Sequence, residues 1–91
     1  MANQRQQLTE YDFALALAKV SDKLKYRRDQ KGDGTYASIH ETLGVLQEEM
    51  TEFEQEVHGK RDRDAQVEEL LDIAVGALWG IASITSGGVD W

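Results

Sequence analysis

The chain contains no cysteine and no proline. Without cysteine it can form neither disulfide bonds nor thiolate metal sites, and it has no cysteine nucleophile. Without proline, no residue interrupts the hydrogen bonds of a helix interior, so long helices are possible. No hydrophobic run approaches the length of a membrane span, and the first residues lack the apolar core of a signal peptide. We therefore expect a cytoplasmic protein that does not enter a membrane.

Basic residues are also few, because 10 of them stand against 17 acidic ones and give a net charge of -7. A general nucleic-acid binder needs a positive surface, so we do not expect nucleic acid as a partner. An acidic surface suits either simple solvation or a site that gathers cations. The 91 residues make one small domain, which we assign to residues 1–91 with loose tails at 1–8 and 87–91.

Apolar residues recur at helical spacing in three segments, and no segment shows the alternation of a strand. We therefore expect an all-α fold built from helical hairpins. The boundaries of the segments are marked by capping residues and helix breakers: Thr9 with Asp12 and the GDGT sequence of 32–35, Ser38 with Glu41 and Gly59, then Asp62 or Asp64 and the SGG sequence of 86–88.

Three short helices rarely enclose a core of their own. The third segment, in the sequence IAVGALWGIASI, is apolar on nearly all sides, which is typical of a helix buried on more than one side. Gly76 and Gly80 would let another helix approach it closely. We therefore expect a homodimer, or a homotetramer formed as a dimer of dimers, in which hairpins combine into four-helix bundles.

The stretch LQEEMTEFEQEV keeps five glutamates among apolar residues. Glu49 and Glu52 lie three residues apart beside the apolar stripe, where like charges repel each other. Glu69 and Asp72 form a second such pair in the sequence EELLD. If a hairpin brings both pairs together, four carboxylates offer an oxygen site suited to Mg²⁺ or Mn²⁺. For either pair alone, a solvated acidic face is the simpler interpretation.

The words EEMTE and EELLD, in this order, resemble the EExxE…EExxD signature of the MazG-like, all-α nucleotide pyrophosphohydrolases. The segment YASIHETLGVLQEEMTEFEQEV is similar to short MazG-like proteins of bacteria and phages. The resemblance covers about residues 36–85. It implies an enzyme that uses Mg²⁺, or Mn²⁺, to hydrolyse a nucleoside triphosphate between its α and β phosphates. The products would be a nucleoside monophosphate and pyrophosphate.

The same resemblance assigns roles to single residues. It implies metal ligands at four positions, namely Glu49, Glu52, Glu69 and Asp72. Glu49 or Glu52 would also act in catalysis by taking a proton from the attacking water. The acids that precede these motifs, Glu48 and Glu68, would support the ligands.

Phosphate groups also need positive donors, which charged segments on either side of the acidic motifs offer. The first candidates lie in the predicted turn between the two acidic helices: Lys60, Arg61 and Arg63. Others lie near the end of the first helix: Arg27, Arg28 and Lys31. Four aromatic residues are candidates for stacking on a base: Tyr26, Tyr36, Trp79 and Trp91.

Two other functions remain open at this point. In the turns after Asp72 only Ser83 is polar, which fits a catalytically inactive MazG-like module that sequesters nucleotides or binds a protein partner. Metal and nucleotide would then raise the melting temperature without hydrolysis. A purely structural helical bundle, whose acids only keep it soluble, would show no metal response.

Overall fold

The computed structural model describes residues 4–59 and 62–89. These residues form three helices and no strand: α1 (Glu10–Lys31), α2 (Ile39–His58) and α3 (Arg63–Thr85). The all-α prediction is therefore confirmed. Parts of both predicted tails, residues 1–3 and 90–91, lie outside the described residues, as do Lys60 and Arg61.

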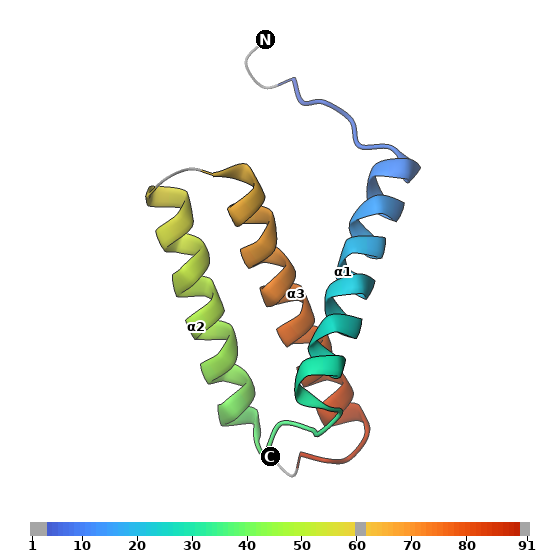
Figure 1. Ribbon diagram of the computed structural model, residues 1–91, viewed down its shortest axis with the longest axis vertical. Helices are drawn as coiled ribbons and strands as arrows, with labels where there is room; N and C mark the ends of the chain where they lie inside the picture. Colours follow the sequence, from blue (N-terminus) through green and yellow to red (C-terminus); the bar gives the residue numbers. More distant parts are fainter. Residues whose placement is uncertain (1–3, 60–61, 90–91) are drawn as a thin grey trace.

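The helices α2 and α3 form an antiparallel hairpin, and α1 lies against α3 only (Figure 1). The helices α1 and α3 run in the same direction, approach each other towards their C-terminal ends and diverge towards their N-terminal ends (Figure 1). Among the described helices, none combines the length and hydrophobicity needed to cross a lipid bilayer.

The starts of α1 and α3 follow the local signals in the sequence. At α1 the predicted capping box is complete: the Asp12 N–H donates to Thr9 Oγ1 at 3.2 Å, and the Thr9 N–H donates to Asp12 Oδ2 at 2.8 Å. At α3 the cap is Asp62 rather than Asp64, because the Asp62 carboxylate accepts two backbone N–H groups of the first turn. Both caps satisfy N–H donors that a helix start leaves unpaired.

The start of α2 differs in one detail from the predicted capping box. Ser38 Oγ accepts the Glu41 N–H at 3.1 Å, as expected. The Glu41 carboxylate, however, accepts the Ala37 N–H at 2.6 Å rather than the Ser38 N–H. The glutamate therefore fixes the connection before α2, which forms one wall of the cavity described below.

The hairpin packs most closely at the glycines of α3. A Cβ atom added to Gly80 would lie 2.7 Å from Thr42 Cγ2, and one added to Gly76 would lie 3.3 Å from Leu46 Cδ2. The predicted close approach of another helix is thus made by α2. Thr42 and Leu46 fill the space along this small-residue face, and Ser83 on the same face is buried.

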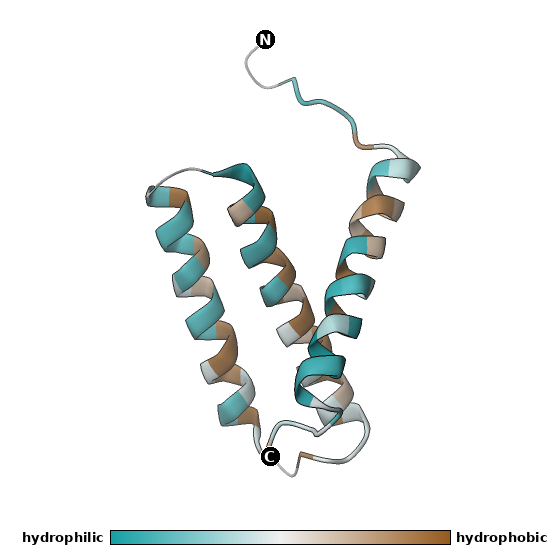
Figure 2. Cartoon of the chain, in the orientation of Figure 1, coloured by the Kyte–Doolittle hydropathy of each residue, from teal (hydrophilic) through white to brown (hydrophobic). Residues whose placement is uncertain are grey.

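Much of the apolar surface of the three helices is not covered within one chain. Val75 is the only buried hydrophobic residue in the described part of the chain. Hydrophobic segments recur along all three helices (Figure 2), and large exposed side chains include Leu17 at 70%, Met50 at 55% and Ile81 at 58%. The helix α3, expected to be buried on more than one side, therefore exposes an apolar face in the single chain.

Candidate metal centre

Three carboxylates of α2 and α3 converge between the two helices of the hairpin. One oxygen each from Glu49, Glu69 and Asp72 lies within 4.8 Å of the other two. All three residues are partly buried. Glu69 and Asp72 share a face of α3 because residues three apart point the same way, and Gly76 and Gly80 continue that face into the contact with α2. We call these three residues the acidic cluster.

The other predicted acids surround this cluster. Glu52 is not one of the three, but it lies within hydrogen-bonding reach of Glu69 and adds its negative charge there. Glu68 is exposed and binds Lys23 of α1. Glu48 is exposed on α2, where it lines a cavity next to the cluster.

The electrostatics of the cluster favour a positive ligand. Burial raises the pKa of Glu49 above its ordinary value of 4.5, and the charges of Asp72 and Glu52 raise it further. Burial likewise raises the pKa of Glu69, with added repulsion from Glu52 and Asp72. Each of these effects disfavours the ionised carboxyl. A bound cation would instead favour the ionised form of these carboxyl groups.

Two oxygens of the cluster also have no hydrogen-bond partner. Glu49 Oε2 and Glu69 Oε2 are buried and unpaired, although buried polar atoms are nearly always satisfied in proteins. Carboxylate oxygens held on two packed helices are the donor set that Mg²⁺ and Mn²⁺ prefer, and three of them leave coordination positions for water or phosphate. The residues present therefore fit a hard divalent cation.

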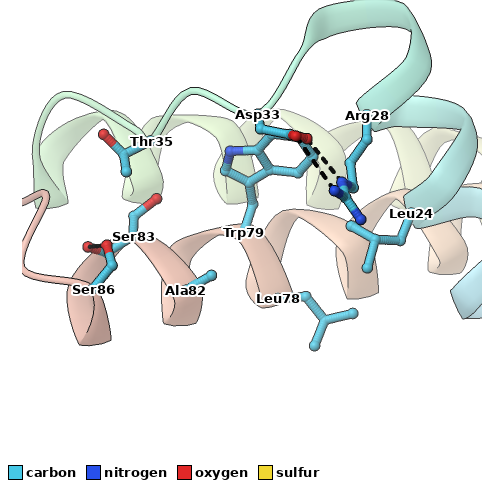
Figure 3. Close-up of a pocket in the computed structure, with 9 residues that line it drawn as sticks. All are labelled: Leu24, Arg28, Asp33, Thr35, Leu78, Trp79, Ala82, Ser83 and Ser86. Carbon is cyan, nitrogen blue, oxygen red and sulfur yellow. Dashed lines mark hydrogen bonds and ion pairs between the residues drawn. The ribbon is translucent and has the colours of Figure 1, made fainter.

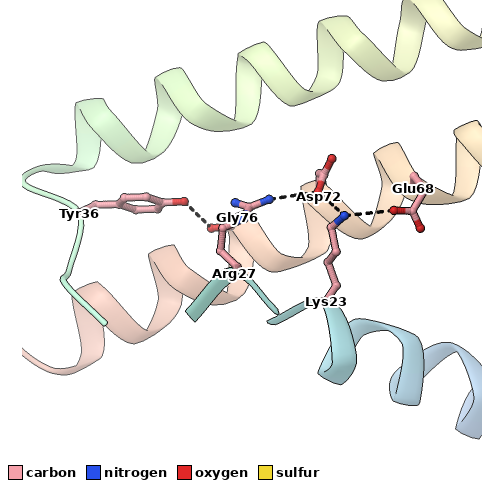
Figure 4. A network of polar contacts seen from close by, with 6 residues as sticks. All are labelled: Lys23, Arg27, Tyr36, Glu68, Asp72 and Gly76. Carbon is pink, nitrogen blue, oxygen red and sulfur yellow. Dashed lines mark hydrogen bonds and ion pairs between the residues drawn. The ribbon is translucent and has the colours of Figure 1, made fainter. Parts of the chain in front are cut away.

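Two basic side chains of α1 contact the same cluster (Figure 4). Lys23 Nζ lies 3.1 Å from Glu68 Oε1 and 3.4 Å from Asp72 Oδ1. Arg27 Nη2 lies 3.1 Å from Asp72 Oδ1. The hydrogen bond to Glu68 is the main cause that raises the pKa of Lys23. The acidic cluster is thus flanked by fixed positive charge within one chain.

Sequence patterns predicted positive donors mainly at other residues. Of these, Lys60 and Arg61 lie outside the described residues, and Arg63 is exposed at the start of α3. Arg63 precedes Glu69 by six residues, which corresponds to about 9 Å along a helix. Arg27 was among the alternative donors predicted from the sequence, whereas Lys23 was not. The available signal was their spacing of four, which places both on one face of α1.

Another cavity lies away from the acidic cluster. It measures about 510 Å³ and is bordered by apolar side chains of α1 and α3, among them Leu24, Leu78 and Trp79 (Figure 3). At its edge Arg28 Nε is paired with Asp33 Oδ1 at 2.8 Å. None of the cluster residues lines it. The candidate ligand site is therefore the smaller cavity that Glu49 lines.

Comparisons with protein-family models, with curated proteins and with solved structures find no match to this chain. Function is therefore inferred from the geometry of the acidic cluster, with the resemblance of the two acidic motifs as a separate line of argument.

Proposed function

We propose that this protein is a Mg²⁺-dependent, MazG-like nucleoside triphosphate pyrophosphohydrolase that cleaves between the α and β phosphates. The observation that carries the proposal is the convergence of Glu49, Glu69 and Asp72 within 4.8 Å, from two packed helices. The unpaired buried oxygens of Glu49 and Glu69 support it. The order of the EEMTE and EELLD motifs supports the substrate class.

In this proposal each group of the site has a chemical role. The acidic cluster holds Mg²⁺, which when bound neutralises phosphate oxygens and lowers the pKa of a coordinated water. Glu49 or Glu52 accepts the proton of the attacking water, and the raised pKa of Glu49 suits a base that works nearer neutral pH. Arg27 and Lys23 donate hydrogen bonds to phosphate oxygens.

The bonds of the reaction balance without a further reactant. The oxygen of water bonds to phosphorus while the bridging P–O bond breaks. Pyrophosphate leaves with that electron pair, and the proton of the water passes to the carboxylate. The products are one nucleoside monophosphate and one pyrophosphate per triphosphate consumed.

The test is a screen of the purified chain against standard and modified nucleoside triphosphates with Mg²⁺ or Mn²⁺. We expect equal amounts of monophosphate and pyrophosphate from at least one substrate, and no turnover with a chelator. Release of orthophosphate, or no turnover with any nucleotide, would contradict the proposal. A rise in melting temperature with metal and nucleotide but no turnover would instead identify a nucleotide-sequestering module.

We also propose that the chain works as a homodimer or homotetramer in which hairpins complete four-helix bundles. The support is the exposed apolar surface of α2, where Leu43 is 53% and Met50 is 55% exposed. Contiguous apolar surface of this kind marks interaction sites on soluble proteins, and a chain of this size gains a core by association.

Met50→Glu should therefore weaken self-association at least about tenfold, because an unpaired charge at an apolar interface costs more than 1.4 kcal/mol. Sedimentation equilibrium of the parent and the variant measures the change. Gln55→Glu, which adds the same charge at an exposed position on a different face of α2, is the matched control and should associate like the parent. A parent that is monomeric at all concentrations would exclude the assembly.

A further inference from the structure

A smaller cavity, of about 350 Å³, opens directly beside the acidic cluster. It lies between the C-terminal end of α1, the connection at 32–38, α2 and α3, and its volume is within the usual range for small-molecule sites, about 300–1,000 Å³. Glu49 of the cluster lines it, and so does Arg27, which binds Asp72. A ligand in this cavity therefore reaches the cluster.

Two fixed aromatic residues form part of the cavity wall, Tyr36 and Trp79. The Trp79 indole N–H donates to the Gly34 carbonyl at 2.7 Å. The Tyr36 backbone N–H donates to Ser83 Oγ at 3.0 Å, and its hydroxyl donates to the Gly76 carbonyl at 3.5 Å (Figure 4). Rings held in this way can contact a flat ligand with little loss of conformational entropy.

The polar groups of the cavity divide by sign. The positive ones, Arg27 and Lys31, come from α1, and the negative ones, Glu41, Glu48 and Glu49, come from α2. Arg27 and Lys31 suit phosphate oxygens. An ionised carboxylate only accepts hydrogen bonds. Glu41 already accepts the Ala37 N–H, so Glu48 is the carboxylate that would pair with an N–H or O–H donor on the ligand. In the described ranges Glu48 makes no hydrogen bond or ion pair of its own.

We propose that this cavity binds the base of the nucleotide and that Glu48 selects a base with an exocyclic amino group. Cytosine presents an amino group where uracil presents a carbonyl oxygen, and a carboxylate attracts the first and repels the second. A site that hydrogen-bonds an N–H group discriminates against the analogue without it. The inference rests on the proposed function and adds the class of base.

The experiment uses the full chain with Trp91→Phe, which leaves Trp79 as the only tryptophan. Three probes are titrated with Mg²⁺: the α,β-methylene analogues of CTP and UTP, which resist cleavage, and inorganic tripolyphosphate, which has no base. We expect the cytidine analogue to bind at least about tenfold more tightly than the uridine analogue, the low end for a hydrogen bond to a charged group. The cytidine analogue should also change the fluorescence of Trp79, since that residue lines the cavity.

A matched pair of variants isolates the role of Glu48. Glu48→Gln should abolish the preference, because an amide donates as well as accepts, and should leave tripolyphosphate binding unreduced. Glu54→Gln removes the same charge from an exposed position of α2 outside the cavity and should keep the preference.

The outcomes separate the inference from the proposed function. Equal affinity for the two analogues, a preference for the uridine analogue, or a preference that survives Glu48→Gln would overturn the inference alone. Binding of tripolyphosphate and release of pyrophosphate would in each case leave the pyrophosphohydrolase in place. No binding of any probe in the presence of Mg²⁺ would overturn both.

Discussion

Glu69→Gln should lower metal-dependent pyrophosphate release at least about 100-fold, the upper end of the loss seen when a group that merely supports a metal ligand is removed. The amide keeps the shape of the side chain but removes the negative charge that Glu69 contributes to the acidic cluster. Glu49→Gln should act in the same way for the same reason. Pyrophosphate release at saturating nucleotide, titrated with Mg²⁺, measures the loss.

The same variant should be more stable than the parent when Mg²⁺ is absent. Burial raises the pKa of Glu69 above 4.5, so the folded chain holds this proton more tightly than the unfolded chain. The free energy of unfolding then falls as the pH rises above 4.5. At neutral pH the ionised Glu69 repels Glu52, and removal of one like-charged pair restores roughly 0.2–0.5 kcal/mol.

Urea denaturation with and without Mg²⁺ measures both parts of this prediction. The gain of Glu69→Gln should shrink as the pH falls towards 4.5, where the parent carboxyl also becomes neutral. Glu54→Gln, which removes an exposed charge outside the cluster, should retain full turnover and the full response to Mg²⁺. A Glu69→Gln protein with the activity and metal response of the parent would exclude the acidic cluster as the metal centre.

Gly80→Ala should lower the free energy of unfolding by roughly 1–3 kcal/mol, the usual cost of overpacking a tight contact. The new Cβ would lie 2.7 Å from Thr42 Cγ2. Thr42 is buried and its hydroxyl donates to the Ser38 carbonyl at 3.2 Å, so its methyl group cannot easily turn away. The better helix propensity of alanine, about 1 kcal/mol, does not remove this clash.

Two further variants identify the cause. Gly44→Ala places a methyl group where nothing lies within 4 Å and should stabilise the protein by roughly 0.5–1 kcal/mol through helix propensity alone. Thr42→Ser removes the clashing methyl group and should restore much of the stability lost in Gly80→Ala. The comparison needs one protein concentration, because association with a second copy also stabilises the fold. Equal effects of both alanine variants would contradict the close packing at Gly80.

The helix boundaries could be read from the sequence because capping is local. Thr9 with Asp12, and Asp62 with the next two residues, act within a single turn. The face on which α2 packs could not be read in the same way. Hydrophobic spacing favours the stripe that includes Leu70 and Ile81, yet these are 48% and 58% exposed. The helix α2 instead packs on the small residues of α3, because Gly76 and Gly80 have no side chain to hold it away.

In the candidate site, too, local features could be predicted from the sequence and contacts between distant segments could not. The spacing of the acids indicated which carboxylates share a face, and the structure brings three of them together. The contacts of Lys23 and Arg27 depend on how α1 lies against α3, and Arg27 binds a residue 45 positions later in the chain. No local pattern encodes such a contact. Lys23 was therefore not among the candidates named from the sequence.

Asp72 Oδ1 forms ion pairs with both Lys23 and Arg27 of α1. The same oxygen atom therefore holds α1 against the hairpin and belongs to the proposed cation site. A cation that binds this oxygen competes with both ion pairs. By thermodynamic reciprocity, whatever loosens α1 from the hairpin makes the carboxylate easier to fill, to the same degree. The orientation of the outer helix and the affinity of the inner site are therefore one coupled equilibrium.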